Sequence, residues 1–174
     1  MNLEDAFLFA AQAHRGQVDK QGQPYILHLM TVVLACDEAD RVVAALHDVV
    51  EDRHATLEEL RALGVSEGDL IVLDALSRRP KESYRDYILR LLGTPRAIRI
   101  KARDLDHNFG RLSGLAPRDQ LRLGPRYAAA IGALIALSGG AVQLDQFSAA
   151  TREQHARFAA HAGDFLREAQ PVRS

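Results

Sequence analysis

The sequence predicts an all-α protein, and three observations support this fold class. Alanine and leucine dominate the apolar residues, tryptophan is absent, and few segments alternate Val, Ile or Thr with polar residues. Apolar residues instead recur every three to four positions, which places them on one face of a helix. The chain of 174 residues is long enough to form a domain with a buried core. We therefore expect helices packed around a common core.

The first two expected helices flank a polar loop. Apolar residues at helical spacing predict a helix over residues 3–14. Residues 14–24 are polar and include glycine and proline, so we expect them to form a loop. An apolar stretch resumes at Tyr25 and predicts a second helix, which a single histidine, His28, interrupts.

The third expected helix, over residues 42–52, begins as an apolar run and ends with His47, Asp48, Glu51 and Asp52. Residues three or four apart share one face of a helix, so His47 lies beside Glu51. For the same reason Asp48 lies beside both later carboxylates. Carboxylates this close raise one another's pKa unless a cation sits among them, and a divalent metal would supply that charge. The alternative is an ordinary helix end, with the acidic side chains in solvent and His47 packed in the core.

His28 offers a partner for this group. Neutral imidazole is the commonest metal ligand in proteins, and His28 lies one helix upstream of His47. Two successive helices with a short connection pack antiparallel, which can bring their histidines together. The alternative is that His28 is a buried histidine whose ring nitrogens are satisfied within the core.

The later helices are predicted from their caps and breakers. Thr56 with Glu59 resembles a capping box. Pro95 suits the first position of a helix, because the N–H group that proline lacks would have no partner there. The expected helices cover roughly residues 56–64, 66–76, 83–93, 94–108, 117–137 and 147–169.

Two further segments carry dense charge. Residues 77–82 form a basic loop, which would suit a polyphosphate beside a metal site or would simply face solvent. In the helix expected over residues 94–108, Asp104 shares a face with both Lys101 and Asn108. This second group is also compatible with an ordinary charged helix end, and spacing alone does not choose among its residues.

Composition excludes several classes of protein. Lys and Arg number 22 against 23 Asp and Glu, so no general nucleic-acid-binding surface is expected. The single cysteine, Cys36, excludes an internal disulfide and a cysteine-based zinc site. The first residues lack a basic leader, and no segment is apolar for long enough to span a membrane. We expect a cytoplasmic protein with neither a nucleic-acid nor a membrane partner.

Separated segments of the chain resemble the hydrolase domain of the Rel/SpoT alarmone enzymes, which are HD-superfamily phosphohydrolases. Ala13-His14 with Gln17 and Lys20 matches the family pattern AHxxQ and the basic turn after it, and Gly22-Gln23-Pro24-Tyr25-Ile26 with His28 matches GEPYIxHP. Leu46–Asp52 matches LHDVVED, and Ile100–Asn108 matches KLADRLHN. The resemblance covers about residues 3–137. It implies an all-helical, metal-dependent enzyme with the HD-domain helical bundle and a metal site between helices.

The resemblance also implies roles for individual residues. The implied metal ligands are His28, His47, Asp48 and Asp104. Glu51 and Asp52 would act on the attacking water, while Lys20, Arg78 and Asn108 would hold phosphate and sugar groups of a nucleotide. Mn²⁺ is the usual ion of the family, and Fe²⁺ or Zn²⁺ would also suit two imidazoles and two carboxylates.

The implied reaction is removal of the 3′-diphosphate from guanosine tetra- or pentaphosphate, which releases pyrophosphate and GDP or GTP. We expect a stand-alone small alarmone hydrolase, with the phosphohydrolase domain over residues 1–140 and a helical extension over residues 141–174 packed on the same domain. The extension could equally serve a homodimer. Two alternatives stay open: a phosphatase or phosphodiesterase acting on another nucleotide, and a non-catalytic nucleotide-binding module.

The chain departs from the family pattern at several positions, and the segment Ala102–Asp106 is more charged than the pattern. Asp19 stands where the family has a basic residue that is expected to stack on guanine. The resemblance therefore predicts the guanine selectivity less firmly than it predicts the metal site. Leu29 follows His28 in place of proline, and Arg53 follows Asp52 in place of threonine. None of these departures removes an implied metal ligand.

Overall fold

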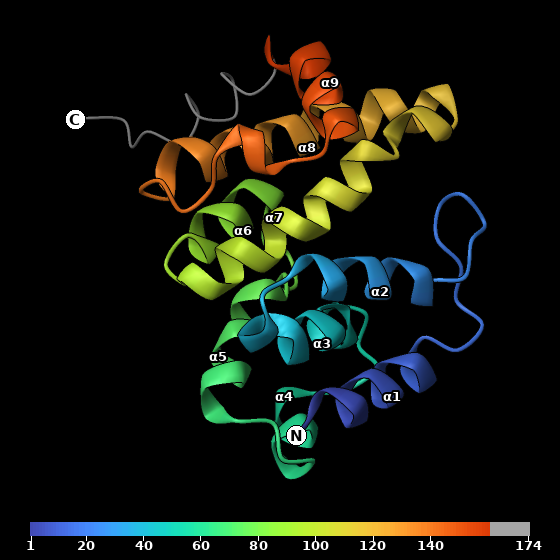
Figure 1. Ribbon diagram of the computed structural model, residues 1–174, viewed down its shortest axis with the longest axis vertical. Coiled ribbons are helices and arrows are strands. Elements are labelled where there is room, and N and C mark those ends of the chain that lie inside the picture. The colour runs from blue at the N-terminus through green and yellow to red at the C-terminus, as the bar shows by residue number, and fades with distance from the viewer. Residues whose placement is uncertain (161–174) are drawn as a thin grey trace. The chain divides into compact units, whose positions relative to one another are not determined.

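The computed structural model describes residues 1–160 as a succession of helices (Figure 1). This part of the chain contains no β-strand beyond one isolated bridge between Val18 and Pro24. The predicted all-α class is therefore confirmed. The helices are α1 (Leu3–Ala13), α2 (Ile26–Ala35), α3 (Arg41–Glu51), α4 (Leu57–Ala62), α5 (Glu67–Leu76), α6 (Tyr84–Leu91), α7 (Pro95–Gly110), α8 (Pro117–Leu137) and α9 (Ala149–Phe158).

The helices begin where polar caps stand. Side chains that accept a backbone N–H from the first turn precede five of them: Asn2, Thr56, Ser66, Ser83 and Ser148. Thr56 and Glu59 bond reciprocally, as the predicted capping box requires. Local sequence signals thus account for these helix starts.

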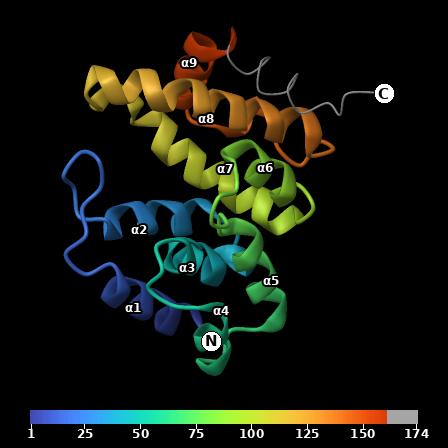
Figure 2. The same cartoon turned by 180° about the vertical axis from the view of Figure 1, so that it is seen from behind.

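The chain divides into two compact units, and the first comprises Met1–Glu82. Helix α3 is its centre and packs against α1, α2 and α5, while α4 packs against α5 (Figure 2). This position explains the apolar first half of α3, in which Val43, Ala44, Ala45 and Leu46 are fully buried. The helix that carries the most functional candidates is therefore the one most enclosed by its own unit.

The second unit begins at Ser83. Within it α8 packs against α6, α7 and α9, and α9 also contacts α7. Hydrogen bonds reinforce the α7–α9 contact: the Ser148 hydroxyl donates to Asp106 Oδ1, and the Thr151 hydroxyl donates to the Asp106 carbonyl. Residues 161–174, which complete the predicted C-terminal extension, lie outside the described residues. The predicted boundary at residue 140 stays a prediction.

Among the helices that the structure describes, none combines the length and the apolar character needed to cross a membrane.

Helices α8 and α9 approach each other closely at Gly124. A Cβ atom built at this position would lie 2.5 Å from Cζ of Phe158, whose side chain is buried. We expect Gly124→Ala to lower the free energy of unfolding by about 1 to 3 kcal/mol, because overpacking forces side chains and backbone to shift. Chemical denaturation followed by circular dichroism measures this change.

The matched control is Gly68→Ala in α5, where the nearest atom to the added Cβ would be Ser66 Oγ at 4.0 Å. This variant should leave the stability unchanged or raise it by up to about 1 kcal/mol. Equal stability of Gly124→Ala and the unmodified chain would contradict the packing described for α8 and α9.

Candidate functional site

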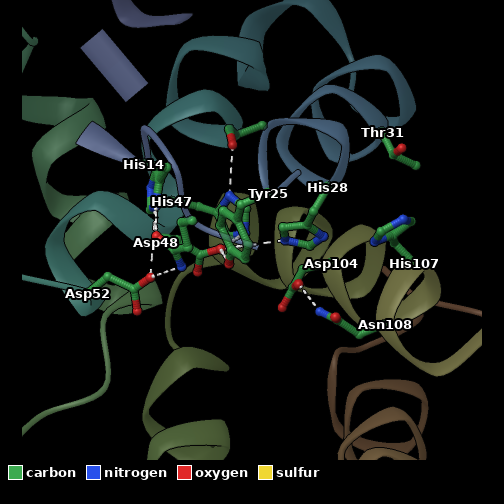
Figure 3. A network of polar contacts seen from close by, with 12 residues as sticks. His14, Tyr25, His28, Thr31, His47, Asp48, Asp52, Asp104, His107 and Asn108 are labelled. Atoms are coloured by element: carbon green, nitrogen blue, oxygen red, sulfur yellow. Dashed lines mark hydrogen bonds and ion pairs between the residues drawn. The ribbon is translucent and has the colours of Figure 1, made fainter. Parts of the chain in front are cut away.

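Two neighbouring helices of the first unit bring three predicted metal ligands together. His28 lies in the first turn of α2, while His47 and Asp48 lie in the second half of α3 (Figure 3). Both histidines are buried, and their ring centroids are 5.4 Å apart. The packing of α2 on α3 therefore places the two imidazoles side by side, as the short connection between the helices predicts.

The carboxylate of Asp48 contacts both imidazoles. Its Oδ2 lies 3.0 Å from Nε2 of His47 and 3.5 Å from Nε2 of His28. The hydroxyl of Tyr25 donates a hydrogen bond to the same oxygen. The ligand atoms of these two histidines and Asp48 all lie within 4.8 Å of one another, so the group could hold a divalent metal.

The orientation of His47 suits metal binding. Its Nδ1 lies 2.8 Å from the backbone carbonyl of Ala44. A carbonyl oxygen only accepts hydrogen bonds, so Nδ1 carries a proton and Nε2 is the nitrogen that faces Asp48. Metal-bound histidines usually make this kind of second hydrogen bond, which fixes the tautomer and the ring orientation. The residues present therefore fit a metal ion.

The charge state of Asp48 also suits a ligand. Burial alone would raise its pKa, but the positive charge of His47 and hydrogen bonds from His28 and His47 hold the pKa well below its ordinary value. The carboxylate is therefore ionised at neutral pH.

No family model matches the chain. The chain is 36% identical over 138 residues to the bifunctional (p)ppGpp synthase/hydrolase SpoT of Escherichia coli (strain K12), covering 70% of this chain and 19% of that protein. It is 32% identical over 133 residues to a probable guanosine-3′,5′-bis(diphosphate) 3′-pyrophosphohydrolase of Synechocystis, covering 68% and 18% of the two chains. The chain is a homologue of SpoT. It spans about a fifth of the length of these relatives.

A solved structure shares the fold of this SpoT homologue. It is a metazoan ortholog of SpoT that hydrolyses ppGpp, with a TM-score of 0.69 at 21% sequence identity. The match covers 92% of this chain and 95% of the other. The predicted all-α HD-domain fold is therefore confirmed.

The predicted water-activating residues lie at the end of α3. Glu51 is its last residue and Asp52 its C-cap, and both are exposed. Gln17, in the loop after α1, donates through Nε2 to Oδ2 of Asp52 at 3.0 Å. The same amide is held through its oxygen by Nδ1 of His14, at 2.7 Å. The loop between α1 and α2 thus positions the Asp52 carboxylate.

Asp104 and Asn108 lie on α7, in the second unit. Asp104 is buried and its carboxylate pairs with Lys101 Nζ at 2.6 Å, while the Asn108 amide donates to its other oxygen (Figure 3). The shared helix face of these three residues is as predicted. Their part in a metal and substrate site stays a prediction.

Lys20 and Arg78, the predicted phosphate ligands of the first unit, lie in exposed loops. The guanidinium of Arg78 donates through Nε and Nη2 to the carbonyl of Glu82, at 2.8 and 2.6 Å. This bond fixes the basic loop after α5. The structure gives neither residue a contact with the His28, His47 and Asp48 group, so their substrate roles stay predictions.

Asp19 has a structural role that its sequence position did not reveal. Its Oδ1 accepts the backbone N–H groups of Gln21 at 2.8 Å and Gln23 at 2.9 Å. Its own N–H donates to the Gln23 carbonyl. A residue that differs from the expected basic side chain therefore closes the loop between α1 and α2.

Sequence analysis did not assign roles to Tyr25, Gln17, His14 and His54. The first three stand within the string that resembles the family, which was the signal available for them. His54 follows the end of α3 and had no such signal. A groove of about 280 Å³ runs along the same loop and is lined in part by His14, Gln17 and Tyr25.

Removing Asp48 should remove the metal. We expect Asp48→Ala to lose one equivalent of bound Mn²⁺ per chain, because the carboxylate contacts both imidazoles. Metal content after dialysis, read by atomic spectroscopy, measures this loss. Asp74→Ala is the control, since Asp74 is an exposed partner of Arg79 and should leave the metal content unchanged. Full Mn²⁺ content in Asp48→Ala would refute the assignment.

Proposed function

We propose that this SpoT homologue hydrolyses the 3′-diphosphate of guanosine tetra- or pentaphosphate, releasing pyrophosphate and GDP or GTP. The group of two buried histidines, His28 and His47, and the partly buried Asp48 carries the proposal, in a chain 36% identical over 138 residues to a (p)ppGpp synthase/hydrolase. The structural relative is described as hydrolysing ppGpp.

The metal site is proposed to consist of His28, His47, Asp48 and Asp104. Two imidazoles and two carboxylates with open positions suit a six-coordinate Mn²⁺, and also Fe²⁺ or Zn²⁺. When bound, the ion would lower the pKa of a water molecule and polarise the phosphoryl oxygen that it faces.

Glu51 and Asp52 are proposed to act on the attacking water. Glu51 lies one helical turn after His47 and is exposed, so its carboxylate can accept a proton from water. Asp52 is held by Gln17 and can orient the same water. The proton leaves the water as its oxygen bonds to phosphorus, the bond from phosphorus to the 3′ oxygen breaks, and the 3′ oxygen takes up a proton from solvent to leave as a hydroxyl.

Lys20, Arg78 and Asn108 are proposed to bind the phosphate and sugar groups. Lysine and arginine supply the positive charge that a polyphosphate requires, and the asparagine amide can both donate and accept. The groove lined by His14, Val18 and Tyr25 is proposed to receive part of the nucleotide.

A second candidate is a metal-dependent phosphohydrolase acting on another nucleotide. Asp19 favours it, because this carboxylate closes the loop where a guanine-stacking basic residue is expected. The non-catalytic module, the homodimer and the cytoplasmic location stay predictions.

Product analysis tests the proposed reaction. Metal-free protein is incubated with guanosine tetraphosphate, a mononucleotide or NADPH, each with and without Mn²⁺. We expect Mn²⁺-dependent release of GDP and pyrophosphate, with the other two compounds unchanged. Turnover of another nucleotide in place of guanosine tetraphosphate would favour the second candidate, and metal binding without any turnover would favour the non-catalytic module.

Replacing Glu51 should separate catalysis from metal binding. We expect Glu51→Gln to keep its Mn²⁺ and to lower kcat by a factor on the order of 10² to 10⁴, the usual contribution of a positioned general base. Steady-state kinetics and metal analysis on one preparation measure both effects. Glu58→Gln, at an exposed residue paired with Arg61 in α4, should keep full activity. Unchanged kcat in Glu51→Gln would remove Glu51 from the mechanism.

A further inference from the structure

A second group of potential metal ligands lies at the end of α3. His14, Asp52 and His54 each offer one ligand atom, and these atoms lie within 4.8 Å of one another. The rings of the two histidines meet edge to face, with centroids 4.6 Å apart. None of these three residues belongs to the His28, His47 and Asp48 group. They come from the ends of two helices and the residues just after α3.

The backbone after α3 brings His54 into this group. Arg53 adopts a left-handed conformation with φ of 62°, which is uncommon for a residue other than glycine. The N–H of His54 donates to the carbonyl of Val49, and the N–H of Arg53 donates to the carbonyl of Val50. These two bonds form the Schellman motif, which turns the chain back over the helix end.

His14 has the features of a metal ligand. Only 4% of its surface is exposed, and its Nδ1 lies 2.7 Å from the amide oxygen of Gln17. Its Nε2 is buried and has no hydrogen-bond partner among the described residues. A buried ring nitrogen without a partner is costly, and a bound cation would satisfy it. The hydrogen bond to Gln17 is the second contact that metal-bound histidines usually make.

Asp52 and His54 complete the group from the solvent side. Oδ2 of Asp52 lies 3.9 Å from Nδ1 of His14, the nitrogen that bonds Gln17, so the Nε2 of the same ring is the one left for a cation. The Asp52 side chain is 38% exposed. His54 is also exposed. Ligand atoms around a tetrahedral Zn²⁺ lie about 3.4 Å apart, given metal–ligand bonds of about 2.0 to 2.1 Å. Two exposed side chains can make this small adjustment by rotation, while the buried His14 stays in place.

We propose that His14, Asp52 and His54 form a second cation site, which takes a divalent ion of borderline softness such as Zn²⁺. Two imidazoles and one carboxylate leave the fourth position of a tetrahedral ion to water. The ring of Tyr25 separates this site from the first: its centroid lies 4.9 Å from that of His14 and 5.2 Å from that of His28. The proposal does not depend on the proposed hydrolysis, although Asp52 takes part in both.

Zinc content tests the second site without an activity assay. Metal-free full-length chain is equilibrated with Zn²⁺, dialysed, and analysed for zinc per chain. The unmodified chain should hold two equivalents, while His54→Ala and Asp48→Ala should each hold one. The double variant should hold none. His54 is exposed, so its replacement should leave the far-ultraviolet circular dichroism unchanged.

Arg53→Gly is the matched control. Glycine adopts the left-handed conformation without strain, so this variant should keep His54 in place and retain both zinc ions. His14→Asn is a second test, because it keeps a polar side chain in the buried position and should also lose one zinc.

Two results would overturn the second site: His54→Ala with as much zinc as the unmodified chain, or an unmodified chain whose only zinc is lost in Asp48→Ala. A zinc ion that stays in Asp48→Ala and is lost in His54→Ala supports the second site. That result is independent of whether the chain hydrolyses guanosine tetraphosphate, so failure of the hydrolase proposal is distinguishable from failure of this one.

Discussion

An ionised carboxylate in contact with two buried imidazoles is the constraint on which the first unit depends. Removing Asp48 from water costs free energy, and the cost is offset only if charged or hydrogen-bonding partners surround it. His47 and His28 supply these partners, and Tyr25 adds a hydroxyl. The partners come from α2, from α3 and from the end of the loop that precedes α2, so the charge at the site depends on how these segments pack.

The energetic logic explains the composition of α3. Its first half contains small and branched apolar residues because α1, α2 and α5 enclose it. Its second half carries the candidate metal ligands His47 and Asp48, which are consecutive residues. The enclosed half anchors the helix, and the ligand-bearing half therefore keeps its position without support from a β-sheet. A metal site at the end of a well-buried helix is in this sense pre-organised.

Much of the fold was predictable from the sequence because its determinants are local. Helical periodicity and polar caps place helices α1 to α8 to within a few residues, and Thr56 with Glu59 forms the predicted capping box. The helix predicted over residues 147–169 begins as expected, but α9 ends at Phe158. The approach of His28 to His47 was also predictable, because short connections favour antiparallel packing. The role of Asp104 beside these histidines rests on the resemblance, since its own unit accounts for its contacts with Lys101 and Asn108.

Contacts made by loops could not be predicted in the same way. Asp19 differs from the family pattern, yet it closes the loop through two backbone N–H groups, and no periodicity encodes such bonds. The turn at Arg53 carries His54 back toward His14, although arginine gives no sequence signal for a left-handed conformation. Such positions depend on tertiary closure, so they become visible only in the folded chain.

The side chain of Tyr25 has two functions at once. Its ring helps to line the groove beside the α1–α2 loop, and its hydroxyl donates to Asp48. One side chain therefore both lines the surface that would meet a nucleotide and donates a hydrogen bond to the carboxylate proposed to bind the metal. Under the proposed function, a substitution at Tyr25 would therefore alter the nucleotide surface and the metal-binding carboxylate together.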